Sequence, residues 1–139
     1  MRLIICLDNN MGYSFCGKRQ SRDETVHRKI LELIKGHKLY MNEYSASLFL
    51  SKRSPSAASL IEIRQRPEIR AKGADWRFVE NTPVDCEPDE MVLFFWNRDY
   101  PSSLRLSLDM SKYILIQETE FKGKSHEKIT QKRYVKETL

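Results

Sequence analysis

The sequence has few cysteines, few histidines and no long apolar run, and each shortage excludes a class of protein. No apolar stretch approaches the roughly 18 residues that a membrane-spanning helix needs. The apolar segment after Arg2 ends at Asp8, which is too early for a secretory signal peptide. The cysteines, Cys6, Cys16 and Cys86, are odd in number and widely spaced, a pattern typical neither of a disulfide framework nor of a zinc site. We therefore expect a small soluble protein of the cytoplasm.

Motifs for metal and cofactor binding are also missing. The three histidines, His27, His37 and His126, are far apart, and no two of them have the spacing of zinc ligands. The phosphate-binding patterns G-x-x-x-x-G-K and G-x-G-x-x-G do not occur. We expect no bound metal and no cofactor, with His27 and His37 at the surface.

The sequence does have a substantial apolar content and an unevenly placed basic charge. With 139 residues, 40% of them hydrophobic and 31% charged, the chain suffices for one folded domain, residues 1–139. Residues 1–73 contain 14 Lys and Arg against 7 Asp and Glu, whereas residues 74–139 contain 10 against 12. This excess is compatible with an RNA or an acidic protein as partner, and a solvated basic surface explains it equally well.

The first 34 residues carry the clearest structural pattern. Residues 2–8 (RLIICLD) predict a buried strand, and residues 9–20 predict a loop. Residues 21–34 predict a helix, because Ser21 and Glu24 form a capping-box pattern. The apolar residues of this helix recur on one face: Val26, Ile30, Leu33 and Ile34.

Further along, the pattern alternates strand and helix and then gives mainly strands. Strands are predicted at residues 38–41, 60–63, 76–79, 91–96, 104–108 and 113–117, and a second helix at residues 42–50. Residues 91–96 (MVLFFW) predict a central strand buried on both faces, and the tail after Ser125 fits an edge strand or a helix. Residues 51–59 predict a loop, and residues 64–73 a short helix or turn. The fold class is therefore α/β: a mixed, mostly parallel central sheet with helices packed on it.

One candidate binding site lies at the start of the first helix. Lys18, Arg19 and Arg22 surround Ser21, where free backbone N–H groups of the helix attract a phosphate or carboxylate. Alternatively, the two arginines pair with carboxylates nearby in the sequence and fix the loop: Asp8, Asp23 or Glu24.

Two further polar segments complete the predicted site. Asn97, Arg98 and Tyr100 follow the strand 91–96, and ligand sites in α/β folds gather at the carboxyl ends of central strands, although an ordinary turn also fits. His126 is the candidate catalytic residue, because imidazole exchanges a proton near neutral pH, although a solvated turn is the commoner explanation of its polar surroundings. We expect all these residues to form one surface.

Five segments together resemble a family of short bacterial proteins that often carry the label ribonuclease Z. They are GKRQSRD (17–23), KLYMNEYSASLF (38–49), FVEN (78–81), FFWNRDYP (94–101) and EFKGKSHEKIT (120–130). They are spread over nearly the whole chain, so the resemblance implies one full-length domain. Zinc phosphodiesterases of that name carry a dense His-x-His-x-Asp-His cluster, which this chain does not have, so the resemblance implies no zinc chemistry.

The N-terminal order of strand, long loop, helix and strand also resembles the dihydrofolate reductase-type fold. LIICLDNNMGYSF (3–15) corresponds to the first strand and mobile loop, and LYMNEYSASLF (39–49) to the second strand and its helix. The acidic residue expected to face a pterin from the first long helix has no secure counterpart, and no glycine pair marks a nicotinamide site. This resemblance therefore implies a fold without implying reductase activity.

Three classes of function fit these observations. The first is a non-catalytic binding protein, such as a toxin-neutralising immunity protein or a regulator, with an acidic protein as partner. The second is an RNA-binding or metal-independent RNA-cleaving protein, in which His126 performs the acid–base step. The third is a nucleotide-binding enzyme of reductase-like fold. The first is slightly preferred, because unlike charge patches occur without a catalytic motif.

Overall fold

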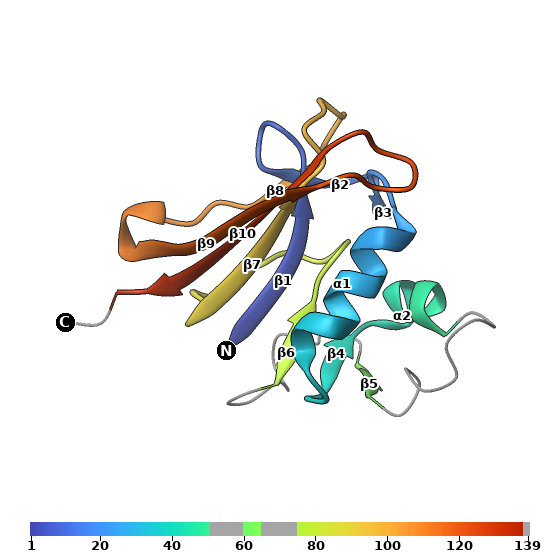
Figure 1. Cartoon of the computed structure of the whole chain (residues 1–139), viewed down its shortest axis with the longest axis horizontal. Helices are drawn as coiled ribbons and strands as arrows, with labels where there is room; N and C mark the ends of the chain where they lie inside the picture. Colours follow the sequence, from blue (N-terminus) through green and yellow to red (C-terminus); the bar gives the residue numbers. More distant parts are fainter. Residues whose placement is uncertain (51–59, 65–74, 138–139) are drawn as a thin grey trace.

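The computed structural model describes residues 1–50, 60–64 and 75–137 (Figure 1). Its centre is a seven-stranded sheet with the order β5-β4-β6-β1-β7-β10-β9. The strands are β1 (Arg2–Leu7), β4 (Leu39–Met41), β5 (Ile61–Ile63), β6 (Trp76–Phe78), β7 (Glu90–Phe95), β9 (Tyr113–Phe121) and β10 (Ile129–Lys136). Neighbouring strands from β5 to β7 are parallel, and β10 is antiparallel to both β7 and β9. The expectation of a mixed, mostly parallel sheet is therefore confirmed.

Two helices pack on one face of this sheet (Figure 1). Helix α2 (Glu43–Phe49) begins after Asn42, whose side chain accepts a hydrogen bond from Ser45 N, as the sequence predicts. Helix α1 (Glu24–Ile34) ends at Lys35 and Gly36, which both have positive φ.

The predicted start of α1 is wrong. The N-cap is Asp23, whose side chain accepts from Thr25 N, and the capping box that begins at Ser21 does not form. Asp and Ser are about equally good N-caps, so the sequence alone does not distinguish the two starts. Because Ser21 is not the cap, its hydroxyl is available for other contacts.

The segment predicted as a loop at residues 9–20 also contains strands. Here β2 (Gly12–Phe15) and β3 (Lys18–Arg19) form a hairpin that is joined by β8 (Leu104–Arg105). The hairpin turns through Cys16 and Gly17, which have φ values of 51° and 79°. The strand predicted at residues 104–108 is thus shortened to two residues and belongs to this smaller sheet.

The core divides into one apolar cluster on each face of the sheet. Strand β7 supplies Val92 and Phe94 to the helix-side cluster, and Met91 and Leu93 to the opposite cluster. All four side chains are buried, and β7 lies between β1 and β10, which confirms a central strand buried on both faces. The ambiguous tail is a strand, β10, and it lies inside the sheet because β9 covers its outer edge.

The loop predicted at residues 51–59 lies outside the described residues, as does nearly all of the segment predicted at residues 64–73. Among the described helices, neither α1 nor α2 is long and apolar enough to cross a membrane.

Candidate functional site

Three segments that are far apart in sequence meet beyond the carboxyl ends of β1 and β7. They are the start of α1, the loop after β7, and the turn between β9 and β10. Asn9, just after β1, donates its backbone N–H to the carbonyl of Arg98 over 2.9 Å. The turn between β9 and β10 reaches the start of α1, where Ser125 donates its hydroxyl to the carbonyl of Arg22. This edge is where the sequence predicts a site.

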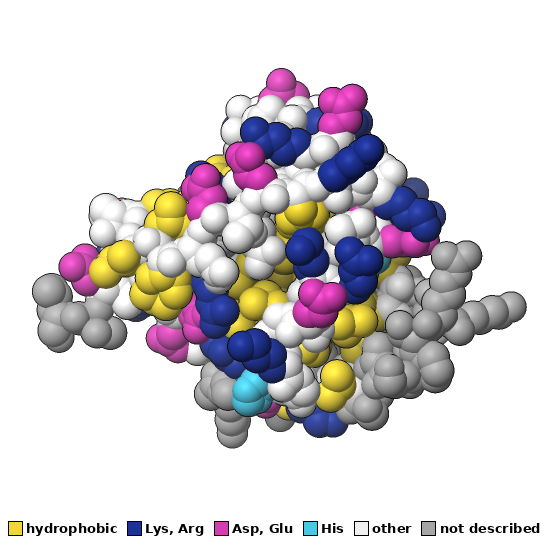
Figure 2. Space-filling model, in the orientation of Figure 1, with side chains coloured by type: hydrophobic (Ala, Val, Ile, Leu, Met, Phe, Trp, Pro, Cys, Tyr) yellow, Lys and Arg dark blue, Asp and Glu magenta, His cyan; other side chains and the backbone are white. Residues whose placement is uncertain are grey.

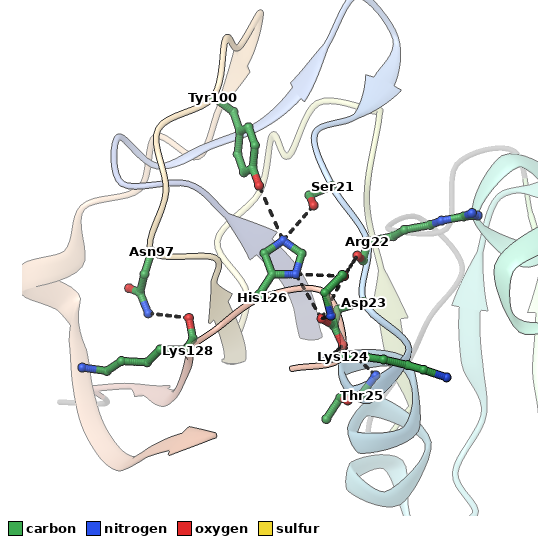
Figure 3. Close-up of polar contacts among 10 residues, drawn as sticks. Ser21, Arg22, Asp23, Thr25, Asn97, Tyr100, Lys124, His126 and Lys128 are labelled. Carbon is green, nitrogen blue, oxygen red and sulfur yellow. Dashed lines mark hydrogen bonds and ion pairs between the residues drawn. The ribbon is translucent and has the colours of Figure 1, made fainter. Parts of the chain in front are cut away.

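His126 lies at the centre of this meeting point (Figure 3). Its Nδ1 is 3.0 Å from Oδ2 of Asp23, and its Nε2 is 2.9 Å from Oγ of Ser21. The hydroxyl of Tyr100 approaches the same Nε2 at 3.5 Å. The structure therefore brings together three of the predicted site residues, His126, Ser21 and Tyr100, and adds Asp23 to them.

The His126 and Asp23 side chains are withdrawn from solvent, with 3% and 0% of their surfaces exposed. The indole of Trp96 stacks on the imidazole at 4.5 Å between ring centres. Gly123 allows the turn to approach so closely, because a Cβ there would collide with the Asp23 carboxylate. His126 is thus enclosed by packing on its ring face and by hydrogen bonds at both nitrogens.

Asp23 is an ionised carboxylate with many donors. Besides Thr25 N and His126, it accepts from the backbone N–H groups of Lys124 and Ser125 at 3.0 and 2.8 Å. Burial raises the pKa of a carboxyl group, but these hydrogen bonds outweigh it and hold the pKa of Asp23 well below its usual range. The alternative in which Asp23 pairs with a neighbouring arginine is therefore wrong, and its partner is a histidine 103 residues away.

Arg19 faces the interior rather than a ligand. Its Nε and a terminal nitrogen donate to the two carboxylate oxygens of Glu80 at 2.9 and 3.1 Å, and its guanidinium lies 4.1 Å from the ring centre of Tyr44. The alternative in which Arg19 forms an internal ion pair is correct, but the partner is Glu80 and not Asp8, Asp23 or Glu24. Arg19 therefore fixes β3 to α2 and to the segment after β6.

The other predicted binding residues take two roles. Lys18, Arg22 and Arg98 are exposed, and within residues 1–50, 60–64 and 75–137 none of them forms an ion pair. Asn97 adopts a φ of 59°, and its amide donates to the carbonyl of Lys128 and to Oγ1 of Thr130. Asn97 therefore joins the loop after β7 to β10, while the three cations remain directed at solvent.

An open groove of about 800 Å³ runs between α1, α2 and the turn at residues 124–125. Its lining combines cations with apolar side chains: Arg22, Arg28, Lys124, Leu31, Leu48 and Phe49. His27 lies in this groove, half-buried, with its ring 5.1 Å from that of Phe49. The expected surface position of His27 is therefore only partly correct, whereas His37 is exposed as expected. Desolvation, assisted by the charge of Arg19, lowers its pKa to about 4.

The described residues contain no group of three or more His, Cys, Asp or Glu side chains placed to hold a metal ion. Cys6, Cys16 and Cys86 are not joined in disulfides. The side chains at and around His126 carry hydroxyl, imidazole and carboxylate groups.

Sequence reasoning missed the partners of His126, which are Asp23, Ser125 and Trp96. The predicted helix at residues 21–34 includes Asp23 in its first turn, and the predicted strand at residues 91–96 includes Trp96. No local spacing connects Asp23 or Trp96 to His126, because they lie 103 and 30 residues away in the sequence. Asp23 is itself a good N-cap residue. Recognising it as the N-cap of α1 would have predicted that its carboxylate lies at the carboxyl edge of the sheet.

The sequence matches no family model and no curated protein, so the ribonuclease Z label receives no support. Among solved structures, the chain resembles a dihydrofolate reductase from Enterococcus faecalis complexed with NADP(H) and RAB-propyl. The TM-score is 0.65 and the identity 11%, over 99% of this chain and 96% of that chain. At this identity the likeness concerns the fold alone, and it confirms the predicted dihydrofolate reductase-type arrangement.

Proposed function

We propose that the protein is a binding protein that docks an acidic protein partner at the carboxyl edge of its sheet. The observation that carries the proposal is the set of exposed cations on a framework of segments held by hydrogen bonds: Lys18, Arg22, Arg98, Lys122 and Lys124. Lys124 also forms an exposed ion pair with Glu24, which an acidic partner would have to displace. Figure 2 shows Lys and Arg side chains over the loops at the top of the molecule and beside them, with some Asp and Glu between.

The framework matters because a surface that is already ordered loses little conformational entropy when it binds. Asp23 and His126 fix the turn that carries Lys122 and Lys124 to the loop that carries Arg22. Asn9 holds the loop that carries Arg98. Four of these cations, all except Lys18 in β3, are therefore carried by three connected loops, which suits a partner with several carboxylates.

The alternatives have weaker support. A ribonuclease that uses His126 directly on RNA needs an accessible imidazole, but 3% of this side chain is exposed and both nitrogens are engaged. The shared fold favours a nucleotide-binding reductase-like enzyme. However, the buried face of α1 consists of Val26, Ile30 and Ile34 and offers no carboxylate.

Fluorescence anisotropy with a labelled polyglutamate peptide tests the proposal, with a single-stranded RNA of equal charge as the second probe. We expect the peptide to bind, and the double variant Arg22→Glu/Arg98→Glu to weaken its binding at least tenfold. The matched control is Lys35→Glu with Lys29→Glu, which changes the net charge equally in α1 and at its C-cap, away from the three loops.

Two results would overturn the proposal. Equal weakening by the two double variants would mean that net charge alone attracts the peptide. Binding of the RNA in preference to the peptide would favour the RNA-binding class. The dependence of affinity on salt between about 50 and 200 mM reports how many phosphates are then contacted.

A further inference from the structure

We infer that Ser21 is a nucleophile activated by His126 and Asp23, and that the protein hydrolyses carboxylic esters at this site. The inference goes beyond the proposed docking function and does not depend on it. It rests on the order Ser21 Oγ, His126 Nε2, His126 Nδ1, Asp23 Oδ2, with distances of 2.9 and 3.0 Å at the two ends of the imidazole. This order is the geometry of a serine–histidine–aspartate triad, which is recognised by geometry and not by sequence position.

The direction of the hydrogen bonds follows from the charge of Asp23. A carboxylate only accepts hydrogen bonds, so the proton in the 3.0 Å contact belongs to Nδ1 of His126. In the neutral imidazole, Nε2 then carries a lone pair and no proton. The hydroxyl of Ser21 must therefore donate to Nε2, which is the arrangement that a general base needs to remove its proton.

The surroundings hold the imidazole in this orientation. Trp96 stacks on the ring, and the backbone N–H groups of Lys124 and Ser125 fix the carboxylate that orients it. Ser21, by contrast, is only half-buried, so a substrate can approach its oxygen. The ring face of the base is covered by Trp96, whereas the Ser21 oxygen next to Nε2 is partly exposed.

Tyr100 supplies a second hydroxyl at the same place. It lies 3.5 Å from Nε2, the nitrogen that Ser21 already occupies at 2.9 Å (Figure 3). Its O–H is thus weakly engaged and can donate to the carbonyl oxygen of a bound ester. This makes Tyr100 the group that would stabilise the charge developing on that oxygen.

The reaction balances with water as the only co-reactant. Oγ of Ser21 bonds to the ester carbonyl carbon while its proton moves to Nε2 of His126. The bond from that carbon to the alkoxy oxygen breaks, and the departing oxygen takes the proton from His126. A water molecule, deprotonated by the same nitrogen, then attacks the acyl-serine, which releases the carboxylic acid and restores the Ser21 hydroxyl.

The charge around the site indicates the class of ester. Arg22 is the next residue after Ser21 and is exposed. Lys124 lies two residues before His126 and is exposed, but its Nζ pairs with Glu24 at 2.8 Å. Figure 3 shows both side chains directed away from Ser21, so they act at a distance from its hydroxyl. A carboxylate at the far end of the acyl group would be attracted by the charge of Arg22, which is unpaired among the described residues. We therefore expect an ester with a negatively charged acyl group to be preferred over a neutral one of similar size.

The experiment uses the full chain and a fluorophosphonate probe, followed by intact-mass measurement and peptide mapping. We expect one adduct, located on Ser21, which Ser21→Ala abolishes and His126→Asn slows at least 100-fold. The control is Ser107→Ala, which removes an exposed hydroxyl outside the site and leaves labelling unchanged. Circular dichroism shows that each variant compared is folded.

Hydrolysis of 4-nitrophenyl hydrogen succinate and of 4-nitrophenyl acetate tests the substrate class, and we expect kcat/KM to be higher for the succinate.

Ser21→Ala is the variant least expected to unfold the chain, so the labelling test remains decisive even if His126→Asn does not fold. The inference is overturned if folded wild-type protein labels Ser21 no faster than Ser107. A folded His126→Asn variant that labels at the wild-type rate also overturns it.

Discussion

Nδ1 of His126 lies 3.0 Å from Oδ2 of Asp23, and this contact joins two residues 103 positions apart. It fixes the turn between β9 and β10 to the start of α1. Because a buried ionised carboxylate needs its donors, the contact, the helix cap and the turn depend on one another. The Asp23 side chain therefore contributes both to the geometry of the candidate site and to the stability of the fold.

Replacing Asp23 by alanine is expected to lower the free energy of unfolding by about 3–5 kcal/mol. The change removes the N-cap of α1 and leaves the donors of Lys124, Ser125 and His126 without their acceptor. Urea denaturation measures the loss. The control Asp99→Ala removes an exposed carboxylate from the loop after β7 and should cost less than about 1 kcal/mol. A similar loss in both variants would contradict the role given to Asp23.

Acid should destabilise the protein partly through Asp23. Its pKa in the folded state is held below the value in the unfolded chain, so its stabilising effect is fully present above about pH 4. That stabilisation is lost as the pH falls further and the unfolded chain takes up the proton first. The unfolding free energy of Asp23→Asn, measured between about pH 4 and 2, should therefore fall less steeply than that of the wild type.

His27 gives a separate effect at higher pH. Desolvation lowers its pKa to about 4, whereas the unfolded chain has the ordinary value of about 6.5. Between these values the unfolded state binds more protons, so stability falls by up to about 3 kcal/mol as the pH is lowered from about 6.5 to 4. His27→Leu should remove this fall, and His37→Leu, which changes an exposed histidine, should not. Chemical denaturation at several pH values decides between them.

Arg19 and Arg22 are expected to behave differently although both were predicted to bind an anion. Arg19→Ala leaves the carboxylate of Glu80, which is 8% exposed, without its partner and should cost about 2–4 kcal/mol of stability. Arg22→Ala removes an exposed cation and should change stability by less than about 0.5 kcal/mol while weakening binding of the acidic peptide. Equal stability of the two variants would contradict the structural role of Arg19.

Much of the fold could be predicted from local patterns. The apolar run of β7 and the apolar face of α1 specify burial directly, because period and composition report which side chains face a core. The two-residue strands β3 and β8 were not predictable, since two residues are too few to show a period. Their pairing with β2 depends on the turn at Cys16 and Gly17 and on residues about 90 positions away.

The candidate site could be predicted only in part. Its location follows from strand direction, because polar residues after β1 and β7 meet at one edge when both strands are parallel. The hydrogen-bond partner of each side chain does not follow from strand direction. From the sequence, either Glu80 or Asp23 could be the partner of Arg19 or of His126. The three-dimensional arrangement pairs Glu80 with Arg19 and Asp23 with His126.

Leu93 and Phe94 test whether β7 is the centre of both apolar clusters. Leu93 packs in one cluster and Phe94 in the other, and both side chains are 0% exposed. Leu93→Ala should cost about 2–5 kcal/mol and Phe94→Ala about 3–5 kcal/mol, because each removes buried atoms and leaves a cavity. The matched control is Ile116→Ala on the edge strand β9, where the side chain is 53% exposed and the cost should stay below about 1 kcal/mol. Thermal and urea unfolding measure all three. If either β7 variant unfolds together with the wild type, that face of the sheet does not carry the core assigned to it.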